Sequence, residues 1–106
     1  VANNGKNELL LNDGFMGFTN MTSGDAVART DDSRGAVMAD LDGDGNLDLY
    51  VANNNAKNEL LLGDGAGGFT AVTSGDAVAR EDPSYDVVAA DLDRDGALDL
   101  YVANDG

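Results

Sequence analysis

Two nine-residue segments of the 106-residue chain place acidic side chains at a spacing that suits metal binding. Residues 40–48 read Asp-Leu-Asp-Gly-Asp-Gly-Asn-Leu-Asp, and residues 91–99 read Asp-Leu-Asp-Arg-Asp-Gly-Ala-Leu-Asp. Aspartates fill positions 1, 3, 5 and 9, and the glycine at position 6 lets the backbone turn sharply enough for the carboxylates to converge. Because like charges this close repel one another unless a cation neutralises them, each segment predicts a cation site.

Hard carboxylate oxygens select Ca²⁺ or Mg²⁺, and calcium fits these segments better. Ca²⁺ accepts about 6 to 8 oxygens in flexible geometry, so four carboxylates, the carbonyl of position 7 and a water would fill its shell. Position 7 differs between the segments, as expected where only the backbone oxygen binds. We therefore expect two Ca²⁺ per chain. The expected ligands are Asp40, Asp42, Asp44, Asn46 and Asp48 for one ion, and Asp91, Asp93, Asp95, Ala97 and Asp99 for the other.

Two other interpretations share part of this pattern. An EF-hand matches at positions 1, 3, 5 and 6, but it requires a glutamate at position 12, where this chain has Val51 or Val102. Its flanking segments should also be helical, whereas here they alternate as strands do. A metal-free acidic hairpin turn accounts for Asp44 and Gly45 alone. Two copies of a nine-residue ligand pattern favour the cation site.

Short alternating stretches surround each acidic segment and predict β-strands. The four strands expected in one period span residues 35–41, 46–53, 59–62 and 69–73. The first two flank an acidic segment and the last two flank a glycine-rich turn, so both pairs predict hairpins. A polar link over residues 74–84 leads to the next first strand, residues 85–92. Aromatic residues at strand positions are expected in the core between blades rather than as sugar-stacking platforms: Phe18, Tyr50, Phe69 and Tyr101.

The whole pattern repeats at a shift of 51 residues. Residues 6–55 match residues 57–106 at 35 of 50 aligned positions. Four short strands in a period near 50 residues are typical of a β-propeller blade. The predicted fold is therefore all-β, with two blades' worth of sequence in circularly permuted register. Residues 1–34 supply the second half of a blade plus a link, beginning with a strand tail at residues 1–3; residues 35–84 supply a complete blade plus a link, and residues 85–106 the first half of another.

Two blades cannot close a ring, because propellers need about four to eight. Unpaired strand edges at both ends would invite aggregation. We therefore expect a homo-oligomer in which the C-terminal half-blade of one chain pairs with the N-terminal half-blade of the next. Three chains would give a six-bladed ring and four chains an eight-bladed ring.

Composition excludes several other chemistries. The chain has 20 acidic and 6 basic residues and a formal net charge of -14, which disfavours nucleic acid and anionic membrane surfaces as partners. It contains neither Cys nor His, so thiol chemistry, imidazole catalysis and zinc sites built on those residues are excluded. No apolar run approaches the roughly 18 residues of a spanning helix, so we expect no membrane insertion.

Residues 40–53, 58–65 and 68–70 resemble the FG-GAP/VCBS repeat, especially its ASPIC and UnbV-like members, and the resemblance covers essentially the whole chain. It implies an integrin-α-like propeller with calcium in each first hairpin, held by the ligands named above. It also implies a structural or interaction role, in adhesion or scaffolding, with protein or glycan ligands. The parent protein is then expected to be extracellular, on the cell surface or periplasmic.

Two alternative functions are a lectin-like propeller that binds carbohydrate and a fragment of a calcium-dependent polysaccharide lyase or hydrolase. We expect no enzyme, because no histidine base is present and the clustered acids are the expected metal ligands. The acids left for catalysis are Asp25, Asp31, Asp76 and Asp82. Arg29 and Arg80 could contact an anionic ligand, but pairing with nearby aspartates is the favoured interpretation. Tyr85 is the best candidate for an exposed aromatic contact.

Overall fold

The regular elements within residues 1–105, which the computed structural model describes, are β-strands and two single 3-10 turns. The strands are β1 (Asn4–Lys6), β2 (Leu9–Asn12), β3 (Phe18–Met21), β4 (Thr30–Ala39), β5 (Asp48–Asn53), β6 (Glu59–Gly63), β7 (Phe69–Val72), β8 (Ser84–Ala90) and β9 (Asp99–Asn104). The turns η1 (Asp25–Val27) and η2 (Asp76–Val78) lie in the links. The predicted all-β class is confirmed. No helical segment in this part of the chain is long and apolar enough to cross a membrane.

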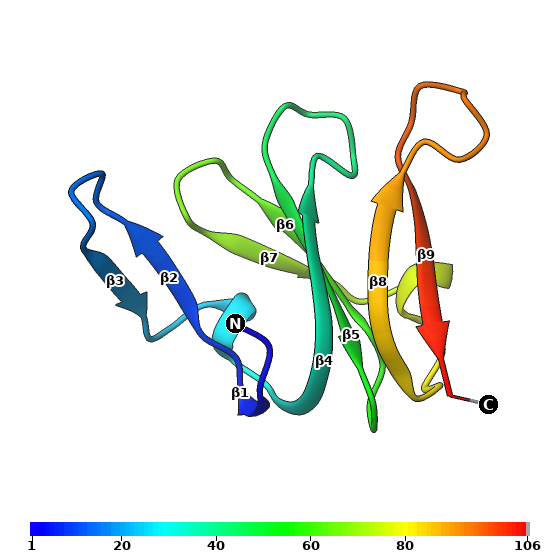
Figure 1. Cartoon of the computed structure of the whole chain (residues 1–106), viewed down its shortest axis with the longest axis horizontal. Helices are drawn as coiled ribbons and strands as arrows, with labels where there is room; N and C mark the ends of the chain where they lie inside the picture. The colour runs from blue at the N-terminus through cyan, green and yellow to red at the C-terminus, as the bar shows by residue number, and fades with distance from the viewer. Residues whose placement is uncertain (106) are drawn as a thin grey trace.

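One complete four-stranded blade occupies the middle of the molecule (Figure 1). β4 pairs with β5, β5 with β6 and β6 with β7, all antiparallel and in sequence order. One row across the blade shows the register: Val37 lies opposite Tyr50, Tyr50 opposite Leu60, and Leu60 opposite Val72. Both hairpins predicted for this blade therefore form.

The ends of the first two strands differ from the prediction on both sides of the acidic loop. β4 ends at Ala39 and β5 begins at Asp48, so residues 40–47 form a longer loop than expected. The reason is local, because Asp40 takes backbone N–H groups of the loop that a strand ladder would otherwise use. β4 also begins earlier than predicted, at Thr30, since its first residues pair with β1.

Two hairpins flank the complete blade (Figure 1). β2 pairs antiparallel with β3 on one side, and β8 pairs antiparallel with β9 on the other. β8 runs beside β4, so the first strands of two successive repeats are neighbours. Adjacent blades of a propeller pack in this way around the central axis. The described chain is thus a propeller-like fragment with one full blade between two halves.

Residues 1–3 depart from the predicted strand tail. The first assigned strand is β1, which pairs with the start of β4. Val1 nevertheless lies opposite Glu8: the Glu8 N–H donates to the Val1 carbonyl (3.1 Å) and the terminal ammonium of Val1 donates to the Glu8 carbonyl (2.6 Å). Val51 faces Glu59 in the same way inside the complete blade. Val1 therefore occupies the position of a second strand at the edge of β2.

The hydrophobic core forms two layers, one on each face of the complete blade. Along β5 the side chains alternate, so that Val51 points to one face while Tyr50 and Ala52 point to the other. The first layer is built on Ala26, Val51 and Leu61, and the second on Tyr50, Ala52 and Val87. The aromatic prediction is confirmed for Tyr50, which is 2% exposed, whereas Phe18 and Tyr101 lie exposed on the half-blades of the single chain, where the core of a neighbouring blade is not complete.

Candidate metal centre

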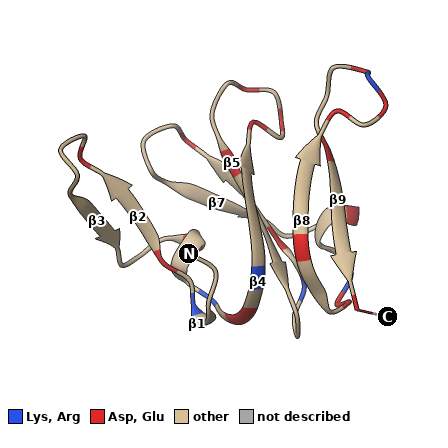
Figure 2. Ribbon diagram, in the orientation of Figure 1, with Lys and Arg blue, Asp and Glu red and all other residues tan. Residues whose placement is uncertain are grey.

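The two acidic segments form loops that project from the same end of the molecule. Residues 40–47 connect β4 to β5, and residues 91–98 connect β8 to β9. Both loops lie at the top of the view in Figure 2, where acidic residues mark each of them. Equivalent hairpins in neighbouring blades thus present four aspartates each to the same rim, and the second loop also carries Arg94.

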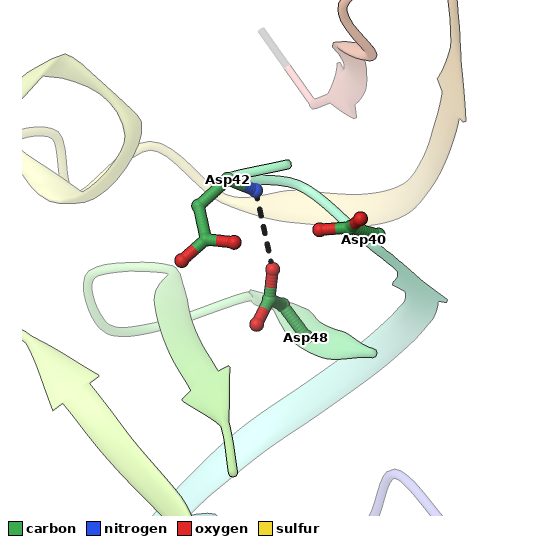
Figure 3. A group of neighbouring side chains, drawn as sticks. All are labelled: Asp40, Asp42 and Asp48. Atoms are coloured by element: carbon green, nitrogen blue, oxygen red, sulfur yellow. Dashed lines mark hydrogen bonds between the residues drawn. The ribbon is translucent and has the colours of Figure 1, made fainter. Parts of the chain in front are cut away.

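Three carboxylates of each loop converge. Asp40, Asp42 and Asp48 each contribute one oxygen to a group in which the oxygens lie within 4.8 Å of one another, as Figure 3 shows from the side. The second loop forms the same group from Asp91, Asp93 and Asp99. The predicted ligands at positions 1, 3 and 9 are therefore brought together in both repeats.

Asp48 anchors the first group from the start of β5. Its side chain is fully buried, and its Oδ2 accepts the backbone N–H of Leu41 (2.8 Å) and of Asp42 (3.3 Å). Its Oδ1 accepts the N–H of Gly63 at the end of β6 (2.9 Å). A buried carboxylate is costly unless its oxygens are paired, and here three backbone donors pair it. Asp48 thereby ties the loop to the neighbouring hairpin.

Asp40 holds the loop in a tight turn by accepting backbone N–H groups with both carboxylate oxygens. Its Oδ1 accepts the N–H groups of Gly43 (2.8 Å) and Asp44 (3.1 Å), and its Oδ2 accepts the N–H of Gly45 (2.9 Å). Gly43 and Gly45 have φ of 80° and 92°, a region that side chains disfavour. Arg94, the repeat equivalent of Gly43, keeps the same left-handed backbone with φ of 63°. The loop shape is therefore preserved even where a side chain makes it costly.

Position 5 stands apart from the carboxylate groups in both loops. The Oδ1 of Asp44 accepts the N–H of Asn46 (2.8 Å), and the Oδ1 of Asp95 accepts the N–H of Ala97 (2.8 Å). Neither aspartate is in the groups formed by positions 1, 3 and 9. The ligand roles of Asp44 and Asp95, and of the carbonyls at position 7, stay predictions.

Crowding of like charges shows in the protonation of the first loop. The N–H of Asp44 lowers the pKa of Asp42, but desolvation by the surrounding loop and the charges of Asp44 and Asp48 together outweigh it, so the pKa of Asp42 lies above its ordinary value. The pKa of Asp44 is lowered, mainly by the hydrogen bond from the Asn46 N–H. The loop thus holds its carboxylates together against their repulsion, which a bound cation would relieve.

The sequence did not predict that the β6–β7 hairpin contacts the acidic loop. Gly63 supplies an N–H to Asp48, and a Cβ at Gly63 would overlap the carbonyl oxygen of Leu47. A Cβ at Gly65 would lie 2.5 Å from Asn46 Oδ1. The β6–β7 hairpin therefore packs directly on the acidic loop. The repeat offered no signal for this, because Asn12 stands at the position equivalent to Gly63.

The arginine candidate lies away from both loops. Arg29 Nε is 2.9 Å from Asp31 Oδ2, a charge contact without hydrogen-bond alignment, and 3.5 Å from Glu59 Oε1. Burial raises the pKa of Glu59, which the charge of Arg29 partly offsets. The contacts of Arg29 are those of the favoured structural interpretation. Tyr85 is partly exposed, and the Arg34 guanidinium lies 5.8 Å from the centre of its ring.

The blades and their acidic hairpins define a class of protein, the repeat modules of β-propeller type. A family model described as the FG-GAP-like repeat matches residues 1–51 and again residues 40–102. Together these matches span almost the whole chain, so the chain belongs to the FG-GAP-like repeat family, as the sequence patterns predicted. No curated protein and no solved structure gives a significant match.

Proposed function

We propose that the chain is a calcium-binding β-propeller repeat module in which one Ca²⁺ pins the first hairpin of each blade. The observation that carries this proposal is the convergence of three carboxylates in each of two equivalent loops. The salt bridges found within residues 1–105 involve other acids, so neither group is paired with a Lys or Arg there, although Arg94 lies in the second loop. The module serves a structural or interaction role, in adhesion or scaffolding, outside the cytoplasm.

The donor set fits calcium in its chemistry. Asp40, Asp42 and Asp48 offer hard oxygens, which Ca²⁺ prefers, and the loop provides further carboxylate and carbonyl oxygens at Asp44 and Asn46. When bound, the ion supplies positive charge that neutralises the cluster and so stabilises the loop. A ligand that binds only the folded chain stabilises it by about 2.7 kcal/mol at a free concentration of 100 times Kd.

The protein orders the ligand side chains of the loop before an ion binds. Asp48 is fixed by three backbone donors, and Asp40 by the N–H groups of the loop, so neither carboxylate has to be ordered by the ion. Pre-ordered ligands bind with a smaller entropic cost. Because both loops project from one rim, two bound ions would fix the spacing of neighbouring hairpins and the surface they display.

Thermal unfolding in calcium, magnesium or chelator tests this proposal with a matched pair of double variants. Asp42→Asn with Asp93→Asn removes one ligand from each loop. Asp13→Asn with Asp64→Asn removes the same charge from the other hairpins, where each aspartate also accepts backbone N–H groups, two against one for Asp42 and Asp93, but joins no carboxylate group. Calcium should raise the melting temperature of the wild type and of the control pair, and far less that of the first pair. Equal calcium responses in both pairs would overturn the proposal.

A further inference from the structure

The two ends of the described chain carry matching halves of the contacts that the complete blade makes within itself. Moving each such contact forward by one period of 51 residues places one partner in β9 or the link before β8. The other partner then falls one period beyond, at a position equivalent to residues 7–12 or to η1. Four independent contacts show this pattern.

The first contact belongs to a line of hydrogen bonds that runs from blade to blade. Asn7 Nδ2 donates to Ser33 Oγ (3.0 Å), and Ser33 Oγ donates to Asn53 Oδ1 (2.7 Å). Within the blade, the backbone N–H of Asn53 donates to Asn58 Oδ1 (2.8 Å), and Asn53 Nδ2 donates to the Lys57 carbonyl (2.9 Å). Asn53 is completely buried by these partners.

The line continues into the last half-blade and stops there. Asn58 Nδ2 donates to Ser84 Oγ (2.9 Å), and Ser84 Oγ donates to Asn104 Oδ1 (2.8 Å). Asn104 is the equivalent of Asn53, yet it is exposed, and no side chain in residues 1–105 accepts its backbone N–H. In the complete blade the N–H of Asn53 has Asn58 as its acceptor. The residue equivalent to Asn58 in the next repeat would be Asn7 of another copy.

The second contact is electrostatic. Arg29 in the link before β4 lies 3.5 Å from Glu59 on β6. Their equivalents are Arg80 in the next link and, one period on, Glu8, the residue directly before β2. Neither Arg80 nor Glu8 forms a salt bridge with any described residue. The two ends therefore carry opposite charges at the positions where the complete blade has its pair.

The third contact is apolar. Leu61 is fully buried against Val51, whereas its equivalent Leu10 is 42% exposed. Tyr50 donates its hydroxyl to the Ala77 carbonyl (2.7 Å) and is buried, whereas its equivalent Tyr101 is 64% exposed. Leu10 and Tyr101 belong to opposite ends of the chain, so a neighbour at each end would bury both.

The fourth contact completes a metal loop. Asp48 Oδ1 accepts the Gly63 N–H from the second hairpin of its own blade. Asp99 accepts the Leu92 N–H (2.8 Å) through Oδ2, but its Oδ1 has no equivalent donor within residues 1–105. One period beyond, the residue equivalent to Gly63 is Asn12. Within residues 1–105 the second acidic loop thus lacks the donor that the first one has, and the N-terminal hairpin of another copy offers an N–H at that position.

We propose that a second copy of this chain occupies these ends, with β9 of one copy pairing antiparallel with β2 of the next to build one blade from two chains. Val102 then faces Glu8 as Val51 faces Glu59. The inference rests on the proposed propeller module and names its partner. Three chains close six blades and four close eight. Residues 1–3 are displaced, because Val1 is hydrogen-bonded to Glu8 and the Asn3 N–H donates to Asn7 Oδ1 (2.8 Å), the places that Val102 and Asn104 take.

One position opposes this pairing and provides a gain-of-function test. A Cβ at Gly63 would overlap the Leu47 carbonyl, and Asn12 brings such a Cβ to the equivalent carbonyl of Leu98. The joint blade must shift locally to admit it. Asn12→Gly removes the overlap and should tighten association by about tenfold, the effect of relieving roughly 1.4 kcal/mol of strain. Deleting residues 1–3 should act in the same direction, because the competing strand is gone.

Native mass measurement of the 10.9 kDa chain at micromolar concentration with calcium is the direct test. We expect closed species of three or four copies. Arg80→Glu should weaken association at least about tenfold, and adding Glu8→Arg should restore it, because the pair is then reversed. A matched control, Lys6→Glu on β1, makes the same change of charge two residues from Glu8 but outside the pair, and should leave the mass unchanged. A monomer for the wild type, or no rescue by the reversed pair, would overturn the proposal and assign the ends to another partner.

Cysteine pairing tests the register, since the chain has no Cys of its own. Mixing Val102→Cys with Glu8→Cys should give a covalent dimer on oxidation, because directly opposed residues have Cβ atoms about 4.5 to 5.5 Å apart. Mixing Val102→Cys with Asn12→Cys, four residues out of register, should not. Equal yields from both mixtures would refute the register. Calcium titration of the same samples separates the two proposals: a monomer that binds calcium refutes only the assembly, and an assembly that binds none refutes only the metal site.

Discussion

Comparing the stability of Asp48→Asn with that of Asp99→Asn tests which hydrogen bonds stabilise the acidic loop. Both changes remove one negative charge from equivalent groups of three carboxylates. At about 4.8 Å in water each lost repulsion is worth about 0.9 kcal/mol, and physiological salt roughly halves it. This gain has the same sign in the two loops, so most of it is removed when the two variants are compared.

What differs between the variants is the second oxygen. Asp48 Oδ1 accepts the Gly63 N–H and the side chain is fully buried, whereas Asp99 is only partly buried and accepts the Leu92 N–H through its other oxygen. An amide has only one acceptor oxygen, so in Asp48→Asn either the Gly63 N–H or the Leu41 N–H loses its acceptor. A buried unpaired donor costs about 1–3 kcal/mol. The Asp48→Asn variant should therefore unfold about 4 °C or more below Asp99→Asn, since 1 kcal/mol shifts Tm by about 4–8 °C at this chain length.

The assay is thermal unfolding followed by circular dichroism, in chelator so that no metal contributes. An Arg80→Glu background keeps the chains apart, because assembly would give Asp99 the donor that it lacks. Equal melting temperatures for the two variants would refute the inferred role of the Gly63 N–H. A lower melting temperature for Asp99→Asn would contradict the burial argument as well.

Three further predictions follow from the local structure at particular residues, and a fourth tests the enzyme alternative. Arg94→Gly should raise stability by about 1 kcal/mol, read as a higher Tm, because the left-handed backbone there disfavours a side chain. Gly63→Ala should lower Tm by more than Gly5→Ala, since only Gly63 would meet a backbone oxygen. Burial raises the pKa of Glu59 above its ordinary 4.5, so the folded chain binds that proton more tightly than the unfolded chain does. The stability advantage of the wild type over Glu59→Gln should therefore shrink as pH rises from about 4 to about 7. A constant difference in Tm would contradict this. Incubation with acidic polysaccharide should release no product, and turnover detected by chromatography would favour the lyase or hydrolase alternative.

The strands and the carboxylate groups were predictable because they depend on local pattern. Alternation around residues 40–48 predicts a hairpin at any site where one face is buried, and the glycine of the loop fixes where the chain turns. The exposed state of Tyr101 was not predictable in the same way. Its local sequence is identical to that around Tyr50, and only the position of a half-blade at the end of the chain distinguishes the two.

Contacts between hairpins were the other part that the sequence could not supply. The N–H of Gly63 reaches Asp48 across 15 positions of the chain, and no residue type marks a backbone donor. The pairing of Arg29 with Asp31 was expected, but the second partner Glu59 lies on a different strand. Such contacts depend on how one hairpin packs on the next, which the repeat period alone does not define.

Calcium binding at equivalent hairpins is the central claim, and isothermal titration in metal-free buffer measures it most directly. The wild-type chain should bind two Ca²⁺ per 106 residues, and Asp40→Asn with Asp42→Asn should reduce this to one, because the loop at residues 91–99 is untouched. The control pair Asp13→Asn with Asp64→Asn should still bind two. No binding heat for the wild type, or an unchanged stoichiometry after loss of Asp40 and Asp42, would contradict the assignment of calcium to these loops.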